Sequence, residues 1–229
     1  MRTEPVVLVH GWGGSFRSTW QAPGWEALLN DAGRRVIGVD LLGHGTAPKS
    51  HDPSDYRDLT PRVRDAIGNS APVDAVGFSL GAMTLLALAA REPSLFGRIV
   101  VGGIGENVFR RDDEAHARLV AAVRGEGDTS DVTSQVFAQY ASQPGNDPEA
   151  LAACLSAPRA RLSPEVLGAV TCPVLVALGD KDFAGPADPL VAALPSASLV
   201  VLRNVDHFAT PESFAFIDAA LEYLDAVPA

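Results

Sequence analysis

Six short apolar segments constrain the fold of this chain most. Helical patterns separate most of them, so the chain alternates between two kinds of predicted element. They cover residues 5–9, 35–39, 73–76, 98–102, 173–178 and 198–202. Their near-continuous Val, Leu and Ile content is typical of strands buried on both faces. Between the second and third segments, Leu59, Val63 and Ile67 recur at helical spacing. This alternation predicts an α/β domain with a mostly parallel six-stranded sheet and helices on both faces.

Two further helices and one interruption complete this pattern. The helices carry Trp25, Leu28 and Leu29 ahead of Gly33, and Phe214, Ile217, Leu221 and Leu224 near the C-terminus. Residues 104–170 contain no convincing strand, although apolar residues recur there at helical spacing. Because this stretch is too long for an ordinary connection, we expect it to be an inserted helical cap. Residues 1–103 and 171–229 would then form the core domain.

Charge and cysteine content exclude several classes of partner. The 229-residue chain has a net charge of −10 and no run of Lys or Arg that could contact phosphates, so we expect no nucleic acid or anionic membrane partner. The adjacent Arg110 and Arg111 come closest to such a run, and we expect them to face solvent. Cys154 and Cys172 have no metal-ligand or disulfide spacing, which indicates free thiols. With no signal-peptide pattern before Pro5 and no long apolar span, we expect a cytoplasmic protein.

A serine stands between one predicted strand and an Ala-rich predicted helix. The sequence Gly77-Phe78-Ser79-Leu80-Gly81 follows the apolar segment 73–76 and precedes the apolar stretch 82–90. A strand that turns sharply through a serine into a helix presents the hydroxyl at the top of the sheet, and the following backbone N–H groups point at the atom that the serine attacks. Glycines on both sides leave room for the turn. Ser79 is therefore the candidate nucleophile.

A serine nucleophile needs a base and an acid that orients the base. Of the five histidines, His207 follows the last predicted strand and so lies at the same sheet edge as Ser79. Asp180 and Asp182 follow the fifth strand and Glu106 follows the fourth, so each could supply the acid. Asp206 is adjacent to His207 in sequence, which makes it a poor orienting group. We expect His10 to support the turn that follows the first strand, while His44 lies in another tight loop.

Five motifs in order resemble the α/β-hydrolase superfamily across essentially the whole chain. They are residues 9–14 (VHGWGG), 40–45 (DLLGHG), 77–81 (GFSLG), 179–182 (GDKD) and 206–208 (DHF). The resemblance implies that Ser79 is the nucleophile, His207 the general base and Asp182 the acid; some members would use Glu106 instead. Because the first strand begins near residue 5, we expect a compact form that lacks the antiparallel strands of larger relatives.

The resemblance also implies an oxyanion hole and a structural aspartate. The oxyanion hole would combine the backbone N–H groups of Leu80 and Trp12, and the Trp12 side chain would line the pocket. Asp40 would hold the turn formed by residues 43–45. From the cap, we expect Phe109, Phe137 and Tyr140 to contact substrate.

The predicted function is hydrolysis of carboxylic esters of small to medium acyl chain through an acyl-enzyme. No metal or organic cofactor is expected, the partner is a small-molecule ester, and the protein would be a monomer or homodimer. A cofactor-free perhydrolase, a thioesterase and a carbon–carbon bond hydrolase use the same residues and stay open, as does a receptor for a small apolar ligand.

Overall fold

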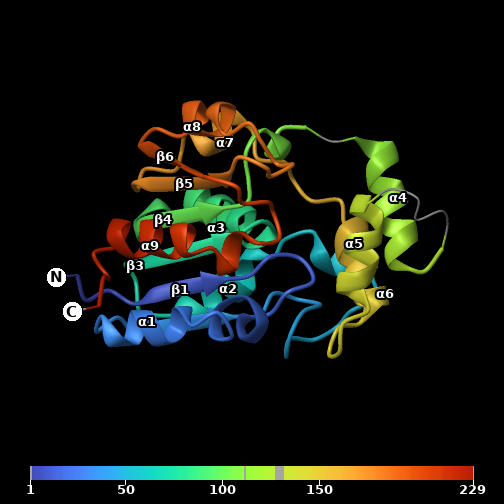
Figure 1. The fold of residues 1–229 in the computed structure, drawn as a ribbon, viewed down its shortest axis with the longest axis horizontal. Helices are drawn as coiled ribbons and strands as arrows, with labels where there is room; N and C mark the ends of the chain where they lie inside the picture. The colour runs from blue at the N-terminus through green and yellow to red at the C-terminus, as the bar shows by residue number, and fades with distance from the viewer. Residues whose placement is uncertain (1, 111, 127–131, 229) are drawn as a thin grey trace.

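A computed structural model describes residues 2–110, 112–126 and 132–228. Six strands form one sheet in the order β2-β1-β3-β4-β5-β6, with every neighbouring pair parallel (Figure 1). The predicted fold class is therefore confirmed. The strands are β1 (Val6–Val9), β2 (Val36–Val39), β3 (Val73–Phe78), β4 (Phe96–Gly102), β5 (Val174–Gly179) and β6 (Ala197–Leu202).

Helices cover both faces of the sheet. The helices α1 (Trp25–Asp31) and α9 (Phe214–Tyr223) pack on one face. The opposite face is covered by α2 (Thr60–Ile67), α3 (Leu80–Arg91), α7 (Pro164–Leu167) and α8 (Asp188–Ala193). In β1, Val7 and Val9 belong to one core and Val6 and Leu8 to the other, because successive side chains of a strand point to opposite faces.

One predicted core position of α9 is wrong. Phe214 is 82% exposed at the first residue of the helix, whereas Phe216 is fully buried and packs against Trp25 with ring centroids 5.2 Å apart. The buried stripe of α9 runs through Phe216, Ile217, Ala220 and Leu221. The centre of this buried stripe is rotated about the helix axis relative to the predicted apolar face. Phe214 therefore lies at the edge of the stripe, where the helix begins.

A buried ion pair fastens the chain termini to the centre of the sheet. Asp74 in β3 is fully buried and accepts hydrogen bonds from Arg2 Nε at 3.0 Å and Arg34 Nη2 at 2.6 Å. Arg34, also fully buried, donates through Nε to the Glu4 carbonyl at 2.8 Å and through Nη1 to the Leu224 carbonyl at 2.6 Å. Both buried charges are thus paired and hydrogen-bonded, as a low-dielectric interior requires.

Three helices, which we call the cap helices, stand apart from the sheet at one end of the molecule (Figure 1). They are α4 (Asp113–Val123), α5 (Val132–Ala141) and α6 (Pro148–Ser156), and they share a small core that includes Val123, Ala141 and Leu151. The predicted cap range 104–170 also contains α7, which packs against α3 and α8 of the core. Positions 1, 111, 127–131 and 229 of the predicted ranges lie outside the described residues.

Short helical turns complete the chain. They are η1 (Arg17–Gln21), η2 (Pro53–Tyr56), η3 (Pro93–Leu95), η4 (Glu106–Val108) and η5 (Thr210–Glu212). In the described part of the chain, every helix is too short or too polar to cross a bilayer.

Candidate active site

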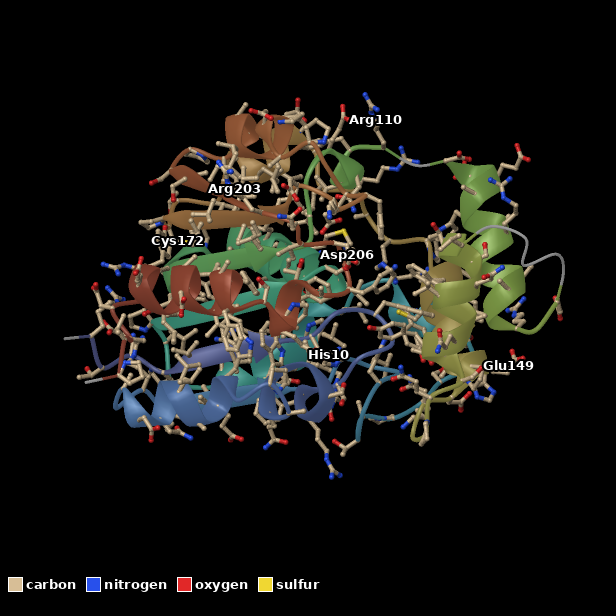
Figure 2. All side chains as sticks on the ribbon, in the orientation of Figure 1. His10, Arg110, Glu149, Cys172, Arg203 and Asp206 are labelled. Atoms are coloured by element: carbon tan, nitrogen blue, oxygen red, sulfur yellow. The ribbon has the colours of Figure 1, made fainter. Side chains whose placement is uncertain are left out.

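Three predicted side chains meet at the carboxyl edge of the sheet. Ser79 follows β3, Asp182 follows β5 and His207 follows β6. The Ser79 Oγ lies 3.1 Å from His207 Nε2, and His207 Nδ1 lies 2.9 and 3.1 Å from the two carboxylate oxygens of Asp182. His10 and Asp206, labelled in Figure 2, lie on the side of the sheet that faces the cap, the side to which the carboxyl ends of β1 and β6 point.

The backbone at Ser79 is strained in the way that a strand-to-helix elbow requires. Ser79 has φ 49° and ψ −111°, which L residues rarely adopt, and its N–H donates to the Gly102 carbonyl at 2.9 Å. A Cβ on Gly77 would stand 2.8 Å from the Cα of Ala82, and one on Gly81 would overlap the Val9 carbonyl. These two glycines therefore let α3 begin directly above the sheet.

Aromatic rings surround His207. Its imidazole centroid lies 5.0 Å from that of Phe78, 4.3 Å from Phe183 and 5.4 Å from Phe208. Phe183 is 54% exposed although it contacts the ring, whereas His207 is only 5% exposed. The rings hold the imidazole in place and shield it from water, which strengthens its hydrogen bond to Asp182.

The structure gives the other candidate acids different partners. Glu106 forms an ion pair with Arg110 at 2.6 Å. Asp180 accepts a hydrogen bond from the backbone N–H of Asn204 at 2.7 Å, and Asp206 accepts one from the N–H of Ala209 at 2.9 Å. Of the four carboxylates, Asp182 is the one within hydrogen-bond distance of His207.

Two loops beside Ser79 are joined by buried polar groups. His10 Nδ1 donates to the Gly11 carbonyl at 2.7 Å, and its Nε2 accepts from the Leu41 N–H at 3.1 Å. Burial lowers the pKa of His10, so the ring is neutral and serves as a structural bridge, in agreement with its predicted support of the turn. The bridge joins the end of β1 to the residues that follow β2.

Asp40 makes a second bridge. Its carboxylate accepts hydrogen bonds from the N–H of Phe16 at 2.7 Å and from the N–H and hydroxyl of Thr46 at 2.8 and 2.9 Å. Burial opposes ionisation of Asp40, but these hydrogen bonds outweigh it and lower the pKa. Asp40 thus holds the end of the 43–45 turn and the loop that follows β1.

The cap holds the loop that carries Trp12. The indole Nε1 of Trp12 donates to the Leu151 carbonyl in α6 at 3.1 Å. The amide of Asn146, just before α6, donates to the Gly13 carbonyl at 2.9 Å and to the Tyr140 carbonyl at 2.8 Å. We call the contacts of Trp12 with Leu151 and of Asn146 with Gly13 the cap clamp. The residues that the clamp joins lie more than 100 positions apart in the sequence, so sequence reasoning could not find them.

A cavity of about 200 Å³ opens beside Ser79 and His207. Of the four residues predicted to contact substrate, Trp12, Phe137 and Tyr140 line this cavity, whereas Phe109 does not and instead packs against the core. Phe109 directly follows η4, which contacts α8 of the core. Lining residues that sequence reasoning missed are Ser18, Thr19, Gln143, Phe208 and Glu212. Phe208 could have been found from its place next to His207.

No group of three His, Cys, Asp or Glu side chains suited to a metal ion occurs within residues 2–110, 112–126 and 132–228. Cys154 and Cys172 are free and buried, and burial raises the pKa of both thiols.

Known proteins resemble this chain over half of its length or more. It is 27% identical over 236 residues to a pimeloyl-[acyl-carrier protein] methyl ester esterase of Neisseria meningitidis, covering 89% of this chain and 86% of the relative. It is 31% identical over 125 residues to Esterase Rv0045c of Mycobacterium tuberculosis, covering 52% of this chain but only 38% of that relative. The fold matches an esterase of Exiguobacterium antarcticum with a TM-score of 0.77 and 19% identity, covering 97% of this chain and 92% of the other.

A model of the alpha/beta hydrolase family matches residues 6–220, a range that contains all six strands and the three side chains at the sheet edge. This chain belongs to the alpha/beta hydrolase family, and several of its relatives are esterases.

Proposed function

We propose that this protein is a serine hydrolase that cleaves carboxylic esters of small to medium acyl chain. One observation carries the proposal: the Ser79 hydroxyl, the His207 ring and the Asp182 carboxylate form a continuous chain of hydrogen bonds of 2.9–3.1 Å. This is the arrangement that nucleophilic catalysis by serine requires, and the esterase relatives support the same chemistry.

In the proposed mechanism, His207 Nε2 removes the proton from Ser79 as Oγ attacks the ester carbonyl. Asp182 holds Nδ1–H, so the neutral ring presents its lone pair to serine and the charged ring that forms is stabilised. His207 then protonates the departing alcohol, and water cleaves the acyl-enzyme by the same route.

The negative charge on the tetrahedral intermediate would be stabilised by the N–H groups of Trp12 and Leu80. Leu80 is the first residue of the twelve-residue helix α3, so the helix dipole also favours an anion there. One such donor lowers the barrier by about 3 kcal/mol. The cap clamp fixes the loop on which the other donor lies.

Cavity size and lining favour a short acyl group. The volume of about 200 Å³ is below the range of roughly 300–1,000 Å³ that is usual for ligand pockets. Trp12 and Phe137 stack with centroids 4.9 Å apart, as do Tyr140 and Phe208 at 5.4 Å, so stacked rings form an apolar part of the wall. We therefore expect p-nitrophenyl acetate and butyrate to react faster than long-chain esters.

The test is turnover of p-nitrophenyl esters of increasing chain length by the wild type and the Ser79→Ala variant. Ser79→Ala should abolish turnover. Ser142→Ala is the matched control, because the Ser142 hydroxyl donates to the Ala138 carbonyl of α5, away from the candidate nucleophile. Equal activity of Ser79→Ala and the wild type would refute the proposal. Parallel assays with a thioester and with hydrogen peroxide plus bromide distinguish ester hydrolysis from the thioesterase and perhydrolase alternatives.

A further inference from the structure

A second cavity, of about 260 Å³, lies between the core and the cap. It borders Leu80 but neither Ser79 nor His207, so it is distinct from the cavity beside the candidate nucleophile. Five separate parts of the chain form its wall: residues 57–60, one side of α3, residues that follow β4, His116 of α4, and residues between 155 and 162 at the end of α6 and after it. Its apolar lining includes Leu80, Met83, Ala87, Val108, Leu155 and Leu162.

Arginines gather around this apolar lining. Of the 16 arginines in the chain, five line the cavity, against a single acidic residue, Asp58. They are Arg57, Arg91, Arg110, Arg159 and Arg161. In a protein of net charge −10, such a cluster reverses the local potential, because a cleft lined by one sign of charge concentrates ions of the opposite sign.

Two of these arginines are neutralised and three keep their charge available. Arg91 pairs with Asp58 at 2.5 Å, and Arg110 pairs with Glu106 at 2.6 Å. Arg57, Arg159 and Arg161 form no ion pair with any carboxylate in the part of the chain that the structure describes.

Arg159 is also held in place. It is half-buried, and its Nη1 donates to the Cys154 carbonyl near the end of α6 at 2.6 Å. This bond orders a long side chain before any ligand arrives, which lowers the entropic cost of binding. The other guanidinium N–H groups remain for a ligand, and their planar fork matches a carboxylate or phosphate.

We propose that this cavity binds a small anionic amphiphile, with a carboxylate or phosphate head at Arg57, Arg159 and Arg161 and a short apolar chain on Leu80 and Met83. The site requires no reaction at Ser79. A polar head alone would leave the apolar wall exposed to water, and an uncharged chain would leave three guanidinium groups without a counter-ion, so both parts of the ligand contribute.

The test measures binding by isothermal titration calorimetry to the Ser79→Ala variant, so that turnover does not contribute heat. The probes are octanoate, octyl phosphate, inorganic phosphate and octanol. We expect octanoate or octyl phosphate to bind at least about tenfold more tightly than octanol or inorganic phosphate, and to bind more weakly as salt increases. The preferred head group then distinguishes a carboxylate from a phosphate ligand.

Substitutions locate the site. Arg159→Gln with Arg161→Gln should weaken binding by about 10- to 100-fold, because hydrogen bonds to charged groups are lost. Arg203→Gln, outside the cavity and labelled in Figure 2, should leave the affinity unchanged. Met83→Trp should block binding by filling the cavity, whereas Tyr140→Ala, in the first cavity, should not change it. Urea midpoints confirm that each variant folds.

Three results would overturn the proposal: octanol binding as tightly as both anions, no binding of either anion, or loss of affinity in Tyr140→Ala but not in the arginine variant. Because binding is measured without turnover, failure here leaves the ester hydrolase proposal standing, and failure of that proposal does not affect this site.

Discussion

Replacement of the candidate acid gives the sharpest test of the geometry at the sheet edge. In Asp182→Asn, one carboxylate oxygen becomes an NH₂ group, and the surroundings decide which one. Asp182 Oδ1 accepts the backbone N–H of Ala184 at 2.8 Å as well as His207 Nδ1–H at 2.9 Å. The Ala184 N–H cannot face an NH₂ donor, so we expect the amide oxygen to stay at the Oδ1 position.

The expected magnitude follows from that assignment. With its oxygen at the Oδ1 position, the amide that replaces the Asp182 carboxylate still accepts the Nδ1–H of His207. The ring loses the negative charge beside it and the second acceptor, because the NH₂ group takes the Oδ2 position 3.1 Å from Nδ1. A hydrogen bond to a charged group contributes about 1.5–3 kcal/mol, so kcat/KM should fall roughly 10- to 150-fold. Asp182→Ala also frees the ring, and a loss of about 10⁴-fold is expected, comparable with removal of the acid from other serine hydrolase triads.

The assay is kcat/KM for p-nitrophenyl acetate with Asp182→Asn, Asp182→Ala and the control Glu106→Gln, which removes the competing acid. Glu106→Gln should change kcat/KM less than about twofold, because Glu106 pairs with exposed Arg110. If Asp182→Asn were as inactive as Asp182→Ala, the NH₂ group and not the amide oxygen would occupy the Oδ1 position. The orienting role given to the Ala184 N–H would then be refuted. Full activity in both variants would exclude Asp182 as the acid.

Three further predictions concern the cap clamp, the buried ion pair and acid stability. Asn146→Ala should lower kcat about 2- to 10-fold with little change in KM, because it loosens the loop of the proposed oxyanion hole; a change in KM alone would refute this role. Asp74→Asn should lower the free energy of unfolding, measured in urea, by about 3–5 kcal/mol, because it leaves Arg34 buried and unpaired. The control Asp225→Asn, at a surface ion pair with Arg98, should lower it by less than about 1 kcal/mol. Equal losses in the two variants would contradict this prediction. Burial lowers the pKa of His44 from 6.5 to about 3, so as the pH falls below about 6.5 the unfolded chain is protonated before the folded one and the free energy of unfolding decreases. At pH 5 the decrease is about 2 kcal/mol. Urea midpoints of His44→Asn should therefore depend less steeply on pH than those of the wild type, and an unchanged slope would rule out His44 as the cause.

The order of strands and helices could be read from the sequence because it depends on local signals, and so could the sheet edge at which the three proposed triad residues lie. Continuous apolar segments mark strands buried on both faces, and the chain direction of parallel strands fixes which loops share an edge. Ser79, Asp182 and His207 each lie in the loop or turn that follows such a strand. Their convergence therefore needs no knowledge of side-chain packing.

Finer features at element ends and surfaces were harder to predict. Phe109 was expected at the pocket and Phe214 in the core, but each lies at the end of a helical element, where helical spacing does not fix which neighbours a side chain meets. Phe183 resembles an ordinary loop residue in the sequence, yet it covers the ring of His207.

The sequence by itself determined an alpha/beta hydrolase fold with a serine, a histidine and an aspartate at one edge of its sheet, because periodicity and short motifs encode them locally. Only the tertiary structure decided that Asp182 and not Glu106 contacts His207, that Asn146 holds the loop of Trp12, and that arginines from distant segments surround one cavity. These contacts join residues far apart in the chain, and no local pattern specifies which distant side chains the packed sheet and cap bring together.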